Sequence, residues 1–245
     1  MRALSAPELL NVWERGLMQP LFQRVLTLLS AACPETSFEE LAELSLGQRD
    51  ARVLTLREWT FGSQVACVVA CSQCGERLEM TVNTTDLRVS PEQPMESRPL
   101  SFRAEDYEVQ FRLPNSLDLQ AIADQHEVTT ARQVLLTRCL SVAQYGGEPI
   151  AVSDLPASVV ESVVEHMAQA DPQADVQFAL ACPQCGQQWQ STFDIAALFW
   201  SELAAWAQRV MREVHILASA YGWRELDILH MSSWRRQQYL NLVNG

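Results

Sequence analysis

The sequence predicts an α+β protein whose β core is split between two hairpins, with a mainly helical insertion between them and helical arms at both ends. The first observation is a C-x-x-C-G motif that occurs twice, at residues 71–75 and 182–186. Each copy follows an apolar segment and precedes a segment in which polar and apolar residues alternate, as in a strand that returns after a turn. The second observation is that apolar residues recur at three- and four-residue steps through most of the remaining chain, which is the helical period.

Composition limits the architecture and the partners. The chain has 245 residues, of which 48% are apolar and 20% charged, the balance of one large or two small globular domains. The formal net charge is −12, and no Arg or Lys lies between Arg138 and Arg209. Such a surface repels phosphate backbones, so we expect no nucleic acid partner. No apolar run approaches the ~20 residues of a membrane span, and we recognise no secretory signal. We therefore expect a cytoplasmic protein without a membrane partner.

Residues 1–62 are predicted to form an N-terminal helical arm. Residues 7–32 carry an apolar stripe at helical spacing, and Pro20 should kink or split this helix near Gln19. A short helical or irregular segment follows at 38–45, and a further helix is expected from residue 46 to about 61, ending at Gly62. The charged side chains of this last helix are expected on a solvated face: Arg49, Asp50, Arg52, Arg57 and Glu58.

The two C-x-x-C-G motifs lie in hairpins that repeat one another. Residues 63–90 form the first predicted hairpin, with strands at 64–70 and 77–83, and residues 174–194 form the second, with strands at 176–181 and 188–193. A shift of 111 residues places the cysteines, the glycine and several apolar positions of one copy on those of the other. This correspondence predicts that the two hairpins pair with each other in space.

The remaining chain is predicted to be an insertion at 91–173 and a C-terminal part at 195–245. Three prolines make 89–99 a loop. The insertion should then contain a hairpin at 100–113, helices at 117–125 and 129–144, an extended piece at 149–152 and a helix from 154 to about 170. The C-terminal part should contain a long helix at 195–220 that Gly222 stops, and a final helix capped by Ser232.

The four motif cysteines, Cys71, Cys74, Cys182 and Cys185, are candidate ligands of one structural Zn²⁺ ion. Each motif supplies only two thiolates, whereas structural zinc takes four ligands, so the two hairpins together make a split zinc-ribbon-like core. Glycine after the second cysteine permits the positive φ that such a turn requires. Two separate sites, completed by Cys67 or by partner residues, remain open. A redox role for the cysteine pairs also remains open, although no βαβ context follows either motif.

No other pattern of catalytic residues is found. The four histidines form no metal-binding motif, and the chain contains no nucleophile elbow, phosphate-binding loop or dinucleotide-binding glycine pattern. Seven cysteines in 245 residues are also too few for a secreted disulfide scaffold. We therefore expect neither an enzyme nor a small-molecule substrate.

Several stretches together resemble the T4-type baseplate hub assembly proteins of contractile phage tails and phage-tail-like injection systems. They are PELL…WERG at 7–16, GQRDAR…LREW at 47–59, the two C-x-x-C-G motifs, and the tail YGWRE…RR…YL at 221–240. The resemblance implies a non-enzymatic assembly or chaperone role. It also implies hub, wedge, spike or tube proteins of a baseplate as partners. It leaves open whether the protein is a transient assembly factor or stays in the finished tail particle.

The tail is the expected partner-binding segment. The residues predicted to contact a partner are Trp223, Arg224, Arg235, Arg236 and Tyr239. Two alternatives stay open: packing of the tail against the rest of the chain, and a helix-turn-helix that reads DNA. The rival class of function is a zinc-ribbon adaptor that binds nucleic acid or acts in transcription.

Overall fold

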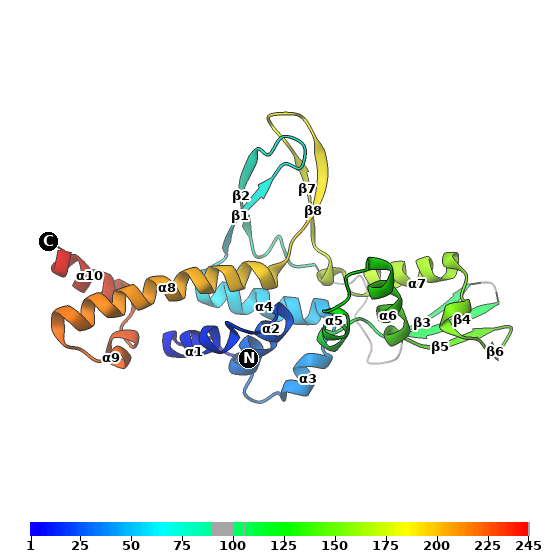
Figure 1. Cartoon of the computed structure of the whole chain (residues 1–245), viewed down its shortest axis with the longest axis horizontal. Helices are drawn as coiled ribbons and strands as arrows, with labels where there is room; N and C mark the ends of the chain where they lie inside the picture. The colour runs from blue at the N-terminus through cyan, green and yellow to red at the C-terminus, as the bar shows by residue number, and fades with distance from the viewer. Residues whose placement is uncertain (90–99, 105, 245) are drawn as a thin grey trace. The chain divides into compact units, whose positions relative to one another are not determined.

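The computed structural model describes residues 1–89, 100–104 and 106–244, and it contains both helices and small sheets (Figure 1). The chain divides into two compact units. The first contains Met1–Phe38 and Ile195–Gly245, and the second contains Glu39–Asp194. The mixed α+β class is therefore confirmed. In the described part of the chain, no helix combines the length and the apolar character that a membrane crossing requires.

The first unit is helical. Its helices are α1 (Ala6–Gly16), α2 (Leu21–Ala32), α8 (Ile195–Tyr221), α9 (Glu225–Leu229) and α10 (Ser233–Asn244). Pro20 splits the predicted N-terminal helix, because it cannot donate the backbone hydrogen bond of a helix interior; it is the N-cap of α2 instead. The side chains of Ser5 and Glu8 form a capping box that begins α1.

A close helix contact organises this unit around Trp200 of α8. A Cβ atom at Gly16 would lie 2.1 Å from the indole ring of Trp200, so only glycine permits this approach of α1. The guanidinium of Arg24, in α2, lies 5.0 Å from the centre of the same ring. Its Nε also donates to the carbonyl of Gly16 at 3.0 Å. One aromatic side chain therefore fixes three helices against one another.

The second unit begins with the last five residues of α3 (Phe38–Glu43), followed by α4 (Leu46–Phe61). Ser45 and Gln48 form a capping box at the start of α4, and Gly62 ends it with a φ of 91°. The prediction of a solvated charged face on this helix is wrong for Arg49 and Arg57, which are 7% and 2% exposed. The guanidinium of Arg57 donates to the carbonyl of Gly62 at 2.7 Å, so it satisfies the helix end from inside the protein.

The insertion contains a four-stranded antiparallel sheet. Its strands run in the order β3 (Leu100–Ala104), β4 (Tyr107–Phe111), β5 (Leu140–Tyr145) and β6 (Glu148–Pro149). The prediction of a helix over residues 129–144 is therefore wrong for its last five residues, because α6 (Val128–Cys139) ends where β5 pairs with β4. Most of the predicted loop at 89–99 lies outside the described residues.

Short helices complete the insertion: α5 (Ser116–Ile122), η1 (Val152–Asp154), α7 (Ala157–Ala170) and η2 (Pro172–Ala174). Apolar side chains of α6, α7 and the sheet form one core, which includes Val109, Leu136 and Val163. Beside it lies the fully buried carboxylate of Asp118, which pairs with Arg112 at 2.6 Å and with Arg138 at 2.7 Å. These pairs tie α5 to the strand before it and to α6.

Candidate metal centre

Two matching hairpins form the candidate site. The first consists of β1 (Gln64–Ala70) and β2 (Arg77–Asn83), and the second of β7 (Gln177–Ala181) and β8 (Gln188–Thr192). Each is a separate two-stranded antiparallel sheet. In both, one face is exposed and the other is buried or half-buried. This alternation is the strand period, and it confirms both predicted hairpins to within a residue at each strand end.

Contacts at the bases of the hairpins bring distant chain segments together. The side chain of Gln173 in η2 donates to the carbonyl of Leu87 at 3.1 Å and accepts from the N–H of Val89 at 2.9 Å. It therefore joins the segment that leaves the first hairpin to the segment that enters the second. Asp171, two residues earlier, accepts from the N–H of Gly47 at the start of α4. The hairpin bases are thus held together within the second unit.

The two turns have the same backbone geometry. The N–H of Cys71 donates to the carbonyl of Glu76, and the N–H of Cys182 donates to that of Gln187, both at 2.8 Å. The glycine of each motif has a φ near 75°, a left-handed conformation that other residues rarely adopt. The repeat with a 111-residue shift is therefore a repeat in structure as well as in sequence.

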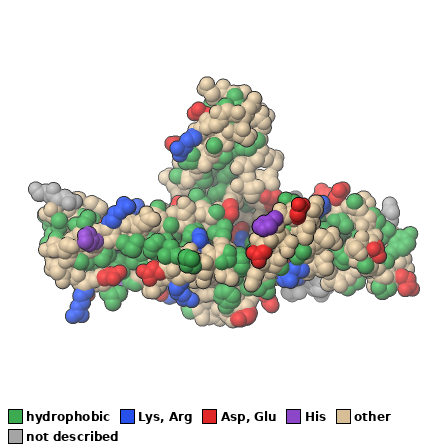
Figure 2. All heavy atoms as spheres, in the orientation of Figure 1, with side chains coloured by type: hydrophobic (Ala, Val, Ile, Leu, Met, Phe, Trp, Pro, Cys, Tyr) green, Lys and Arg blue, Asp and Glu red, His purple; other side chains and the backbone are tan. Residues whose placement is uncertain are grey.

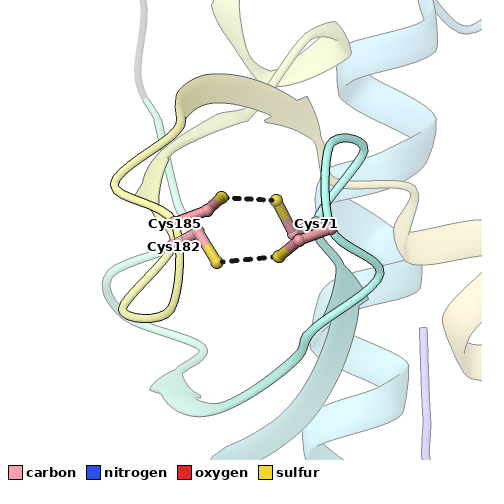
Figure 3. Close-up of side chains that lie close together, drawn as sticks. Cys71, Cys182 and Cys185 are labelled. Carbon is pink, nitrogen blue, oxygen red and sulfur yellow. Dashed lines mark hydrogen bonds between the residues drawn. The ribbon is translucent and has the colours of Figure 1, made fainter.

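The four motif sulfur atoms lie together at the hairpin tips, all within 4.8 Å of one another. The Sγ atoms of Cys71 and Cys185 are 3.7 Å apart, and those of Cys74 and Cys182 are 3.6 Å apart (Figure 3). A tetrahedral ion with Zn–S bonds of about 2.3 Å separates its sulfur ligands by about 3.8 Å. A disulfide would hold the sulfurs about 2.05 Å apart. The spacing therefore fits four thiolates around one ion, and it does not fit a disulfide.

Backbone donors stabilise negative charge at this cluster. The N–H groups of Cys74 and Gln73 lower the pKa of the Cys71 thiol to about 7. The N–H of Glu76 acts in the same direction on Cys74, but burial and the neighbouring thiols outweigh it and raise the pKa of Cys74 to about 12. Without a cation, Cys71 and Cys74 therefore resist losing both of their protons together. A divalent cation would remove this repulsion, because it pairs with each thiolate.

The remaining cysteines lie elsewhere. Cys67 is on the half-buried face of β1, and it is not part of the four-sulfur cluster. Cys139 is buried at the end of α6, where burial and the carboxylate of Asp118 raise the pKa of its thiol to about 11. Cys33 is buried in the first unit. None of these three belongs to the four-sulfur cluster.

The five predicted partner residues have different environments in the first unit. Trp223 stacks on Tyr221 and meets Tyr239 edge to face, with ring centres 4.5 and 4.8 Å apart. Arg236 is 4% exposed; its Nε donates to Glu213 at 2.9 Å. Arg224 and Arg235 are exposed. Three of the five therefore pack against their own chain. Of the two exposed arginines, Arg235 places its guanidinium 5.8 Å from the centre of the Tyr239 ring.

The sequence reasoning missed two exposed apolar side chains on the last helix. Trp234 and Leu242 are each 72% exposed, although tryptophan and leucine are usually buried. On α10 they lie roughly opposite Arg236 and Leu240, which are buried. Plotting residues 233–244 at 100° per residue would have separated these two faces.

Comparison with known proteins gave one finding. A family model described as T4 bacteriophage base plate protein matches residues 19–200, which include both hairpins and the whole insertion. Comparison with curated proteins and with solved structures gave no match.

Proposed function

The chain belongs to the T4 bacteriophage base plate protein family, and on this premise we propose that it is a non-enzymatic assembly factor or structural subunit of a contractile-tail baseplate. Its partners would be hub, wedge, spike or tube proteins of that baseplate. The family match carries this proposal. The strong acidity of the chain also favours a protein partner over nucleic acid.

We further propose that Cys71, Cys74, Cys182 and Cys185 hold one structural Zn²⁺ ion. Four thiolates satisfy the tetrahedral coordination that structural zinc sites use. The sulfur spacing supports this assignment. The N–H groups of Glu76 and Gln187, which donate to Cys74 and Cys185 at matching positions of the two turns, support it as well. With all four positions filled by protein, the ion would act as a cross-link between the hairpins.

Such a cross-link has a clear physical purpose in this fold. A two-stranded hairpin is only marginally stable alone in water, and the two hairpins share no backbone ladder. The ion would join residues more than 100 positions apart in sequence, so its binding free energy would become folding free energy. It would thereby hold the hairpin tips together, at the opposite end from the bases that Gln173 joins.

The C-terminal tail is the proposed docking segment. Arg224 and Arg235 keep the partner-contact role predicted from the sequence, and we add Trp234 and Leu242 because their exposure leaves them free to enter a partner surface. The proposed role of Trp223, Arg236 and Tyr239 is to hold this segment in place, since each packs within the chain.

Deleting residues 222–245 tests the assembly role. The deletion removes α9 and α10 of the first unit but leaves the four cysteines of the second, so zinc content controls for folding of the second unit and thermal unfolding for that of the first. We expect tails without normal baseplates when this variant replaces the full chain, as seen by negative-stain electron microscopy. Normal baseplates would refute the docking role of the tail.

A further inference from the structure

Among the residues that the structure describes, the outer edge of β1 has no partner strand. Thr84 N–H donates to the carbonyl of Ser63 below β1, and Cys71 N–H donates to that of Glu76 above it. Residues of an antiparallel strand alternate between facing the partner strand and facing away. The odd-numbered residues of β1 therefore bond to β2, and the N–H and C=O groups of the even-numbered ones point outward: Gln64, Ala66, Val68 and Ala70.

Nothing in the described part of the chain covers this edge. β1 pairs with β2 alone, and no backbone hydrogen bond reaches the outward groups of Ala66, Val68 or Ala70. All four even-numbered residues are exposed, and Val68 keeps 52% of its surface in solvent. Four consecutive outward positions therefore offer backbone donors and acceptors over the full seven-residue strand.

The edge also lacks the usual protection against strand addition. Proteins commonly place charged side chains or proline on open edges. β2 follows this rule on its own open edge with Arg77 and Glu79, whereas β1 has the sequence QVACVVA, without charge or proline. In the view of Figure 2, the blue and red side chains of the paired hairpins gather over the β1–β2 hairpin. Within that hairpin they belong to the β2 side of the ladder and to the turn, so β1 is its unprotected strand. The shorter strands β7 and β8 of the second hairpin likewise carry neither charge nor proline, and β1 is distinguished from them by its seven-residue length.

We propose that β1 accepts an extended strand from another baseplate protein, which would become the third strand of this sheet. The partner class rests on the proposed function. Backbone groups of the added strand would bond to Ala66, Val68 and Ala70. On one face its alternate side chains would extend the apolar row of Val65, Cys67 and Val69, so they should be β-branched or aromatic.

Charge narrows the chemistry of this strand further. The chain has a net charge of −12, so a segment rich in acidic residues would be repelled on approach. Basic residues that flank the paired segment would be attracted instead. The occupant is therefore an uncharged, apolar strand with neutral or basic flanks.

A second copy of this chain fits the edge less well. Seven residues span about 23 Å, and one strand paired edge to edge buries well below the ~1,200 Å² of a stable interface. Two chains of charge −12 would also repel each other. A different subunit can add contacts beyond the strand and avoids this repulsion.

A matched pair of proline variants tests the proposal. Ala66 and Thr81 lie directly opposite each other, and the N–H groups of both point away from the ladder between them. Ala66→Pro removes a donor from the β1 edge, and Thr81→Pro removes one from the β2 edge, so neither breaks a bond between β1 and β2. Zinc content and melting temperature of the full-length variants show whether each still folds.

The readout is the number of copies incorporated per purified tail, measured by quantitative mass spectrometry. We expect Ala66→Pro to reduce incorporation about tenfold, the effect of losing roughly 1.4 kcal/mol of pairing, and Thr81→Pro to leave it unchanged. Equal incorporation of folded Ala66→Pro and wild type would overturn the proposal and leave the baseplate role intact. Normal tails assembled in the absence of this protein would contradict both the strand-addition proposal and the baseplate role.

Amide exchange of the wild-type chain gives a second measurement that needs no variant. The N–H groups of Ala66, Val68 and Ala70 should exchange freely in the isolated chain and become protected in purified baseplates. Unchanged exchange in the baseplate would contradict strand addition. Protection in the isolated chain, together with a dimeric mass in light scattering, would assign the edge to a second copy and so refute the proposed partner.

Discussion

The carboxylate of Asp171 accepts a hydrogen bond from the backbone N–H of Gly47 at 2.8 Å, across 124 positions of the chain. A Cβ atom at residue 47 would lie 1.9 Å from the other carboxylate oxygen, so glycine is required for this approach. Burial raises the pKa of Asp171, and the bond from Gly47 opposes that shift. The pair joins the start of α4 to the segment that leads into the second hairpin.

Gly47→Ala should therefore destabilise the protein by about 3 kcal/mol, because it forces the carboxylate away from a buried donor. Urea denaturation measures the loss. Asp171→Asn is the matched control; it keeps an oxygen that can accept from Gly47, so its loss should be smaller, about 1 kcal/mol. A Gly47→Ala protein as stable as wild type would show that the contact between the start of α4 and Asp171 does not contribute to the free energy of unfolding.

Asp118 should make stability depend on pH in acid. Its buried carboxylate is desolvated, which opposes ionisation, but Arg112, the N–H of Asn115 and Arg138 outweigh this and lower its pKa to about 2. A folded-state pKa below the usual 3.8 means that the stabilisation is present above pH 3.8 and is lost as pH falls towards 2. The amount lost should be roughly 2 kcal/mol.

Comparison of wild type with Asp118→Asn isolates this effect from other acid-labile groups. The variant should be less stable by about 3 kcal/mol at pH 7, because Arg112 and Arg138 lose their buried partner. The difference in the free energy of unfolding between wild type and Asp118→Asn should become smaller between pH 4 and pH 2, as followed by chemical denaturation. Glu108→Gln is the control, since its partner Arg103 is exposed and the pair contributes little. A gap that stays constant with pH would contradict the assigned ion pairs.

Zinc content should depend on all four motif cysteines and on no other. We expect one zinc per wild-type chain and none in Cys182→Ser, measured by inductively coupled plasma mass spectrometry, together with a lower melting temperature. Cys67→Ser is the matched control, because Cys67 lies in the same hairpin outside the sulfur cluster; it should retain one zinc. Retention of a full equivalent by Cys182→Ser would refute the shared site.

Trp234→Ala should weaken assembly without weakening the fold. Its side chain is 72% exposed, so truncation leaves no cavity. At a partner interface the loss of a central tryptophan costs at least about 2 kcal/mol, or roughly thirtyfold in affinity. Trp223→Ala should instead lower the melting temperature, since it removes the stack on Tyr221. Incorporation into tails and thermal unfolding measure the two effects, and full incorporation of Trp234→Ala would exclude this residue from the interface.

The sequence predicted the parts of the fold that depend on local patterns. The cysteine motifs and the alternating segments around them identified both hairpins, because turn chemistry and strand period are short-range properties. The same reasoning extended α6 through residues 140–144, since SVAQ is compatible with a helix until β4 supplies hydrogen bonds. Pairing with a strand about thirty residues earlier decides the structure there, and no local pattern carries that information.

Side-chain environments were harder to predict than elements. Arg57 looked like a solvated charge, yet it caps a helix end from inside the protein, because a nearby carbonyl satisfies its guanidinium. The role of Gly47 was equally hidden, since its partner comes from another part of the chain. The four-cysteine cluster is the exception. Each C-x-x-C motif supplies two ligands and a structural zinc ion takes four, so the sequence alone predicts that the two distant motifs meet.

The split cysteine motif also has a consequence during synthesis on the ribosome. The second cysteine pair follows the first by 111 residues, so at 5–20 residues per second the first pair waits about 6 to 20 s for its partner. A chain that terminates before residue 182 carries only half of a coordination sphere. Metal uptake would therefore discriminate between chains that contain both hairpins and truncated chains, before any of them reaches an assembling particle.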